Sequence, residues 1–140
     1  MKVKDAMHSG ATWVQPSASL TEIAKRMRDT DVGAIPVRAD GQIVGIVTDR
    51  DIACRAVADG RDVSKLTAQD IMSKDVISCS ADEDISAAIK LMEKKKVRRL
   101  PVTDSQNALV GMLSLGDISH KANKELSGEV LRAVSGHHAH

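Results

Sequence analysis

Two short segments of the chain place a hydroxyl residue and an aspartate three positions apart. The segments are GIVTDRDI and GMLSLGDI, in which the pairs are Thr48 with Asp51 and Ser114 with Asp117. An ionised aspartate has two acceptor oxygens, whose spacing suits the two neighbouring hydroxyls of a ribose. Dinucleotide-binding folds use an acid on ribose in an analogous way. The pattern therefore indicates a candidate ribose site at each segment.

The same pairs also fit a purely structural role. Each pair falls where a short apolar strand is expected to end and a helix to begin, and a helix N-terminus favours a Ser or Thr cap with an acid in its first turn. A capping box usually has Glu or Gln at its third position, and Asp is shorter. Helix capping and ligand binding are compatible with each other, and the residues alone leave both open.

Basic and apolar side chains stand close to both pairs in the sequence. Guanidinium groups bind phosphate well, so three arginines are candidate phosphate ligands, with ordinary surface charge as the alternative: Arg50, Arg98 and Arg99. Two apolar dipeptides could supply rigid walls for a base: Ile35-Pro36 and Leu100-Pro101.

Both segments belong to an internal repeat. Pro101 lies 65 positions after Pro36, and the same offset joins further pairs: Asp5 with Asp70, Met7 with Met72, and Leu20 with Ile85. After one extra residue in a turn the offset becomes 66, which joins Gly45 to Gly111. Matches that keep register over so many positions indicate a tandem duplication.

Each copy contains the pattern of an amphipathic helix. One helix is expected to begin at Leu20 and the other at Ile85, because apolar residues follow each at the spacing of one helical face. Ser19 and Asp84 stand at the capping positions, and Ser19 with Glu22 has the form of a capping box. A second helix is expected after each hydroxyl–acid pair.

Strands are expected on both sides of the first helix of each copy. The short strands before the helices are predicted over 12–14 and 76–78, and the hairpins after them over 33–37 with 42–47 and 98–102 with 109–113. The predicted order is β-α-β-β-α, twice, an α/β (α+β) fold with copies at 1–65 and 66–127. So small a copy is near the lower limit for independent stability. The copies are therefore expected to stack with pseudo-two-fold symmetry and to leave ligand-sized clefts between them.

Composition narrows the classes of function. The chain of 140 residues is 42% hydrophobic, has Trp13 as its only aromatic residue and carries a formal net charge of +1. Neither a basic surface nor an aromatic platform for nucleic acid is indicated. Cys54 and Cys79 lack disulfide or metal-ligand spacing, and no apolar run is long enough to span a membrane. We expect a soluble cytoplasmic protein without a nucleic-acid or membrane partner.

Other polar residues carry weaker signals. Ser114, Asp117 and His120 lie close in the sequence, but they lack the context of a nucleophile elbow, so catalysis is not expected. His8 is interpreted as an ordinary loop residue, and Cys54 as a small buried hydrophobe.

The segments GIVTDRDI and GMLSLGDI, together with GAIPV and RRLPV, resemble the repeats of CBS domains (cystathionine β-synthase domains), of which a tandem pair is called a Bateman module. The resemblance covers residues 1–127. It implies a stand-alone regulatory pair for signal transduction or energy sensing, which is not an enzyme and requires no cofactor.

Similar pairs bind adenosine-containing ligands. By resemblance, ribose is held by Thr48 with Asp51 and by Ser114 with Asp117. The backbone that lines adenine corresponds by resemblance to two segments: Gly33, Ala34, Ile35 and Pro36 in the first copy, and Arg98, Arg99, Leu100 and Pro101 in the second. The implied ligands are AMP, ADP, ATP or NAD(H), with S-adenosylmethionine less favoured.

The alternative function is a structural or protein-interaction module with empty clefts and an unidentified target protein. Similar modules also pair into a disc-like homodimer, for which residues 128–140, expected to be a helical extension and tail, offer apolar surface. The tail histidines are candidate ligands for a metal ion or part of a frayed end: His137, His138 and His140.

Overall fold

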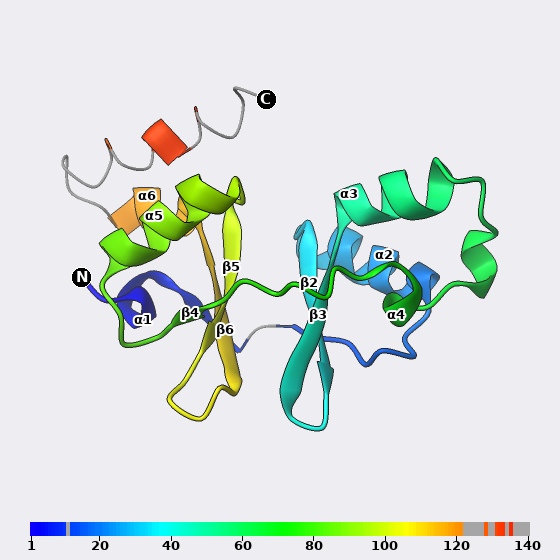
Figure 1. Cartoon of the computed structure of the whole chain (residues 1–140), viewed down its shortest axis with the longest axis horizontal. Helices are drawn as coiled ribbons and strands as arrows, with labels where there is room; N and C mark the ends of the chain where they lie inside the picture. The colour runs from blue at the N-terminus through cyan, green and yellow to red at the C-terminus, as the bar shows by residue number, and fades with distance from the viewer. Residues whose placement is uncertain (11, 122–127, 129–130, 134, 136–140) are drawn as a thin grey trace. The chain divides into compact units, whose positions relative to one another are not determined.

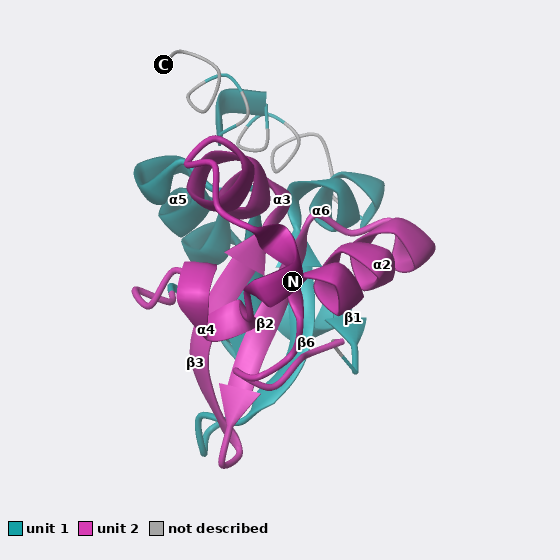
Figure 2. Ribbon diagram, turned by 90° about the vertical axis from the view of Figure 1, so that its right-hand side faces the viewer, with its two compact units in different colours: residues 1–11, 77–140 teal, residues 12–76 magenta. Residues whose placement is uncertain are grey.

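Short helices and strands alternate along the chain (Figure 1). The computed structural model describes residues 1–10, 12–121, 128, 131–133 and 135. The chain forms two compact units, which Figure 2 colours separately. Unit 1 comprises Met1–Ala11 and Ile77–His140, and unit 2 comprises Thr12–Val76.

Unit 2 is built on one antiparallel hairpin. Its elements are α2 (Leu20–Thr30), β2 (Ala34–Ala39), β3 (Gln42–Thr48), α3 (Asp49–Asp51), the π-helical segment η1 (Ile52–Val57), the 3-10 segment η2 (Val63–Lys65) and α4 (Ala68–Ile71). The turn Asp40-Gly41 joins β2 to β3 with positive φ at both positions, 52° and 79°, as in type I′ hairpins. Single bridges from Val14 to Val37 and from Ser73 to Ile46 extend the hairpin.

Unit 1 repeats this topology with complete strands. Its elements are α1 (Val3–Ala6), β1 (His8–Ser9), β4 (Cys79–Ser80), α5 (Ile85–Lys95), β5 (Arg99–Thr103), β6 (Leu109–Ser114) and α6 (Leu115–Lys121). The strand order is β1-β6-β5-β4, in which β4 runs parallel to β5 and the other pairs are antiparallel. The bridges at Val14 and Ser73 stand where unit 1 has β4 and β1.

The predicted helices and hairpins are confirmed in type and order, with differences at their ends. The strand predicted over 12–14 is reduced to the single bridge of Val14 with Val37. The strand expected over 76–78 lies instead at Cys79–Ser80, because Cys79 is the residue in register with Val102 of β5. The expected capping box of α2 is half formed. Ser19 accepts the Glu22 backbone N–H at 3.1 Å, but the Glu22 carboxylate pairs with Arg26.

The compact units divide the chain differently from the sequence copies at 1–65 and 66–127. Each unit takes the first residues of the other copy, through equivalent backbone hydrogen bonds. Val3 N–H donates to the Glu83 carbonyl at 3.0 Å in unit 1, and Ala68 N–H donates to the Ala18 carbonyl at 2.9 Å in unit 2. Residues 1–10 therefore complete the sheet of the second copy, and residues 66–76 complete the sheet of the first.

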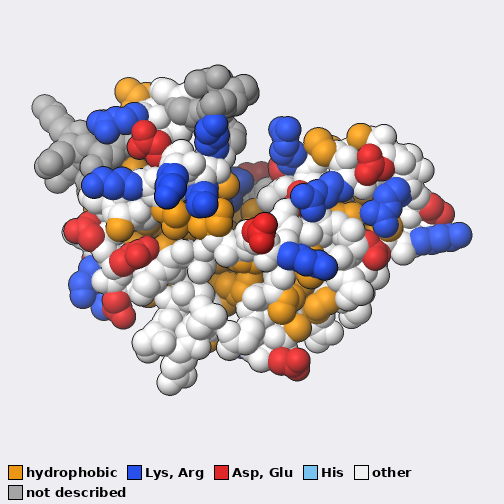
Figure 3. All heavy atoms as spheres, in the orientation of Figure 1, with side chains coloured by type: hydrophobic (Ala, Val, Ile, Leu, Met, Phe, Trp, Pro, Cys, Tyr) orange, Lys and Arg blue, Asp and Glu red, His pale blue; other side chains and the backbone are white. Residues whose placement is uncertain are grey.

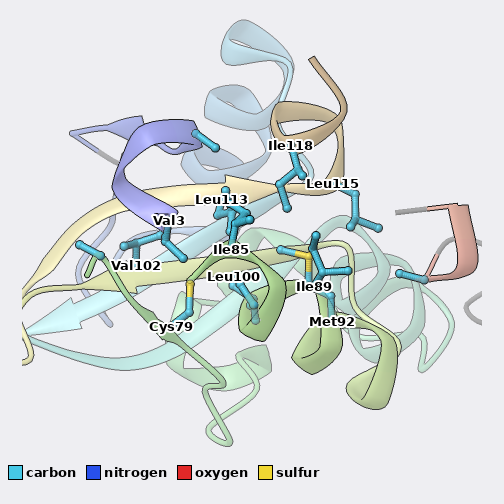
Figure 4. Close-up of a cluster of buried hydrophobic side chains, with 14 residues drawn as sticks. Val3, Cys79, Ile85, Ile89, Met92, Leu100, Val102, Leu113, Leu115 and Ile118 are labelled. Carbon is cyan, nitrogen blue, oxygen red and sulfur yellow. The ribbon is translucent and has the colours of Figure 1, made fainter. Parts of the chain in front are cut away.

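Buried apolar side chains form one cluster in each unit, where helices cover the sheet. In unit 1, side chains from α1, α5 and α6 point toward those of β4, β5 and β6 (Figure 4). The cluster of unit 2 is built from α2, the hairpin, η1 and α4, with these largest members: Leu20, Ile23, Ile35, Val37, Val47 and Ile71. Figure 3 shows basic and acidic side chains interspersed on the face that it views.

Much of the expected extension at 128–140 lies outside the described residues, including His137, His138 and His140. Residues 131–133 are helical. Ala133 is buried in the cluster of unit 1, and Leu131 is 68% exposed. Among the residues that the structure describes, no helix is long and apolar enough to cross a membrane.

Two equivalent glycines let the exchanged segments approach the hairpins. A Cβ built on Gly111 would lie 2.5 Å from the carbonyl oxygen of His8, which is backbone. A Cβ on Gly45 would lie 2.5 Å from Sδ of Met72, the end of a flexible side chain. We expect Gly111→Ala to lower the free energy of unfolding by about 1–3 kcal/mol, and Gly45→Ala to lower it by less.

Denaturant unfolding of both variants beside the wild type measures this difference. Equal losses would show that the backbone of β1 can shift as easily as the Met72 side chain.

The two cysteines have opposite environments, and the expectation for Cys54 is wrong. Cys54 is exposed on η1, where Ala56 is the residue that faces the core, and Cys79 is 4% exposed. Burial, with a smaller contribution from the Glu83 charge, raises the pKa of the Cys79 thiol to about 12, so its reactive thiolate is scarce near neutral pH. We expect Ellman's reagent to modify one thiol rapidly in the native protein and both in denaturant. Cys54→Ser should remove the rapid phase, and a rapid phase that persisted would contradict this assignment.

Candidate functional site

Thr48 and Asp51 bind each other at the junction of β3 and α3. The Asp51 Oδ2 atom accepts the Thr48 backbone N–H at 2.9 Å, and the Thr48 hydroxyl accepts the Asp51 N–H at 3.0 Å. This is a reciprocal capping box in which Asp takes the place of the usual Glu. The shorter acid reaches the backbone because strand and helix join without an intervening loop.

Ser114 and Asp117 form the same arrangement where β6 enters α6. The Asp117 Oδ2 atom accepts the Ser114 N–H, and the Ser114 hydroxyl accepts the Asp117 N–H, both at 3.0 Å. The structural role of both pairs is thereby confirmed. The capping bond involves only the Oδ2 atom of each carboxylate, so the Oδ1 atom is left for other partners.

The start of the preceding strand lies beside each pair. The Gly33 carbonyl accepts the Asp49 N–H at 2.9 Å, and the Arg98 carbonyl accepts the Leu115 N–H at 3.0 Å. In the next register position, Ala34 pairs with Thr48 and Arg99 with Ser114. Each unit thus brings the first residues of its GAIPV or RRLPV segment to its hydroxyl–acid pair, as the sequence suggested.

The apolar candidates lie in the interior instead of on an open surface. Ile35 is 0% exposed and Leu100 is 1% exposed, and both belong to the cores of their units. Pro36 and Pro101 are also buried. This differs from the prediction that their side chains form walls for a base, because the central residues of β2 and β5 pack within the fold. Among the arginines, Arg50 and Arg99 are exposed and Arg98 is half-buried.

Two residues that the sequence analysis did not assign to the site lie at the Oδ1 atoms of the two aspartates. Arg55 Nε is 3.7 Å from Asp51 Oδ1, and His8 Nε2 is 2.8 Å from Asp117 Oδ1. The four-residue spacing of Asp51 and Arg55 on one helix could have indicated the first contact. No local signal points to the second, and the interpretation of His8 as a loop residue is wrong, since it lies in β1.

A cleft of about 490 Å³ lies at the opposite end of the hairpin of unit 2, around the turn Asp40-Gly41. Trp13 lines it, with the Arg38 guanidinium 5.0 Å from the ring centroid. Neither Thr48 nor Asp51 contributes to this cleft, so it is separate from the candidate site.

The chain is a tandem-repeat module, because it has two α/β units of the same topology. In each unit an aspartate carboxylate caps the helix at a strand–helix junction. The family model of the CBS domain matches residues 3–56 and 68–124. The chain therefore belongs to the CBS-domain family and carries a tandem pair, as the resemblance implied.

Relatives of similar length support this assignment. The chain is 37% identical over 139 residues to the CBS domain-containing protein YhcV of Bacillus subtilis, covering 99% of this chain and 98% of the relative. It is 32% identical over 132 residues to hypoxic response protein 1 of Mycobacterium tuberculosis, covering 94% of this chain and 92% of the relative.

Solved structures share the fold. The crystal structure of hypoxic response protein I with two coordinated zinc ions has a TM-score of 0.80 at 32% identity, covering 88% of this chain and all of that one. The CBS domain pair of MJ0100, in complex with 5′-methylthioadenosine and S-adenosyl-L-methionine, has a TM-score of 0.78 at 28% identity, covering 92% of this chain and 98% of that one.

The capping role of the hydroxyl can be tested alone. Ser114→Ala removes the acceptor for the Asp117 N–H and should lower the free energy of unfolding by about 1 kcal/mol. Ser114→Thr keeps the hydroxyl that the first copy uses at Thr48 and should be nearly neutral. Chemical denaturation measures both, and an equal loss in the two variants would assign the effect to something other than the hydrogen bond.

Proposed function

We propose that the chain is a non-catalytic sensor that binds an adenine nucleotide, AMP, ADP, ATP or NAD(H), at Asp51, at Asp117 or at both. The observation that carries the proposal is the state of these two carboxylates. Each is held in one orientation by a backbone N–H on Oδ2, and each side chain keeps a small exposed fraction, 12% for Asp51 and 15% for Asp117. A carboxylate has about four lone-pair sites, so acceptor capacity remains for the two hydroxyls of a ribose.

The ligands of a relative support the choice of an adenosine compound. Both molecules bound by the CBS pair of MJ0100 contain adenosine. Arginine near each carboxylate favours a ligand that also carries phosphate, since Arg50 and Arg55 follow the first hydroxyl residue and Arg99 pairs with Ser114. We therefore prefer nucleotides to S-adenosylmethionine as ligands of this chain. The homodimer implied by the resemblance stays a prediction.

The described residues fit a zinc ion less well than they fit a nucleotide. Hypoxic response protein I was solved with two zinc ions, but within the described part of this chain no three His, Cys, Asp or Glu side chains are grouped to hold a metal. We propose no metal site. A protein-interaction module with empty sites is the competing function.

Substitution of the two aspartates tests the site, with a control for the helix cap that each also provides. Asp70→Ala removes the same kind of cap at α4, where Asp70 Oδ2 accepts the Thr67 N–H at 2.8 Å. We expect Asp51→Ala or Asp117→Ala to weaken nucleotide binding by about 1.5–3 kcal/mol, or roughly 10- to 150-fold. Asp70→Ala should lower the melting temperature without changing affinity, and a similar loss of affinity in all three variants would refute the site.

The ligand itself is identified by thermal shift with AMP, ADP, ATP, NAD⁺, NADH and S-adenosylmethionine, and with GTP as the control. A ligand at about 100 times its dissociation constant adds about 2.7 kcal/mol of stability, which a melting curve resolves. A flat panel would overturn the proposal and favour the protein-interaction module.

A further inference from the structure

The contact between His8 and Asp117 joins two residues that lie far apart in the sequence. His8 Nε2 is 2.8 Å from Asp117 Oδ1. The backbone of His8 is fixed by β1, where His8 pairs with Met112 of β6 and the Gly10 N–H donates to the Val110 carbonyl. Gly111, next to Met112, permits this close approach of the His8 carbonyl. The fold therefore delivers an imidazole from the first copy to the carboxylate of the second.

The imidazole occupies the acceptor atom that the proposed ribose contact needs. Oδ2 of Asp117 is taken by the Ser114 N–H, so Oδ1 is the oxygen left for a ligand, and His8 lies on it. The His8 side chain is 81% exposed, whereas that of Asp117 is 15% exposed. The ring can therefore swing into solvent at little cost in packing, while the carboxylate stays in place.

The equivalent position in unit 2 has no imidazole. Ser73 lies 65 positions after His8 and pairs with Ile46 of β3 as His8 pairs with Met112. The cation at the Asp51 carboxylate is Arg55, whose guanidinium does not lose its proton near neutral pH. One carboxylate thus has a partner that can titrate, and the other has a partner of constant charge.

We propose that His8 is a residue of the Asp117 ligand site and that its protonation closes this site. Histidine changes charge between about pH 5 and 8. As an imidazolium it holds Oδ1 in a charge-assisted hydrogen bond, about twice as strong as a neutral one, and a ribose hydroxyl must compete with that bond. As a neutral imidazole it yields Oδ1 more readily. Ligand binding at Asp117 therefore weakens as the pH falls, and binding at Asp51 does not.

The other charged groups near His8 have different partners or serve as controls for its contact with Asp117. Lys121 Nζ is engaged with the Asp5 carbonyl at 2.9 Å. Helix α1 precedes β1 in the chain and α6 follows its partner strand β6, and their charged and titratable groups besides Asp117 are Lys4, Asp5, His120 and Lys121. His120 is on α6 with Asp117 and serves as the matched control, because it is a second histidine of the same unit.

The test is calorimetric titration with adenosine at pH 5.5 and pH 8. Adenosine carries the ribose but no phosphate, and a phosphate monoester would itself titrate in this range. All proteins in this titration carry Asp51→Ala, so the heat measured comes from adenosine binding at the Asp117 site. We expect adenosine to bind roughly two- to fivefold more weakly at pH 5.5 than at pH 8, the range of an exposed ion pair. Adding His8→Ser, which copies Ser73, should abolish this difference and strengthen binding at pH 5.5, and His120→Ser should leave it unchanged.

The inference rests on the proposed function, and the outcomes separate the two. Binding at pH 8 with the same pH dependence in the His8→Ser and His120→Ser proteins would overturn the role of His8 and leave the nucleotide site intact. Adenosine binding that Asp51→Ala abolishes at pH 8 would show that Asp117 holds no ligand, and would also overturn the role of His8. No binding of adenosine by the protein with Asp51 present would overturn the role of His8, and the thermal-shift panel of nucleotides would then decide separately whether the proposed function stands.

Discussion

A strand that runs straight into a helix leaves backbone N–H groups without partners at the junction, because the first turn of a helix has no preceding carbonyls. In this chain a carboxylate meets that need twice. Asp51 and Asp117 each accept the N–H of the hydroxyl residue three positions earlier, and that hydroxyl accepts the N–H of the acid. The bonds that stabilise the junction also hold the carboxylate in one orientation, so a ligand would not bear the entropic cost of ordering it.

The duplicated junctions differ in what surrounds them. The capping bonds agree to within 0.1 Å between the units, but the second oxygen meets Arg55 in one unit and His8 in the other. Duplication thus preserved the part that fixes the backbone, whereas the neighbours that set charge diverged. This pattern is expected when the fold requires one oxygen of the carboxylate for capping and places no requirement on the residue that contacts the other oxygen.

Local features of the fold could be predicted because they depend on residues close in the sequence. The helices at Leu20 and Ile85 follow from apolar spacing, and the turn at Asp40-Gly41 from residues that tolerate positive φ. The exchange of residues 1–10 and 66–76 could not be predicted, because a segment that occurs in two similar copies fits either sheet by pattern alone. The contact of His8 depends on that exchange, so it was missed as well.

The burial of both faces of β2 and β5 also could not be predicted from the sequence. Ile35 and Leu100 belong to strands with near-continuous apolar residues, for which alternation gives no outward face. Their assignment to a ligand-facing wall required knowledge of which neighbours cover them. The structure instead places both in the cores.

The route of the chain through the two units has a consequence for its synthesis. Unit 2 is one continuous stretch, Thr12–Val76, whereas unit 1 joins Met1–Ala11 to residues made after it. A ribosome completes the synthesis of unit 2 before it begins β6, and domains generally fold as units during synthesis. The strand His8–Ser9 meets its partner only after Leu109–Ser114 has been made. Residues 1–10 are therefore made before unit 2 and pair only with segments made after it, so a chaperone could capture them while unit 2 folds.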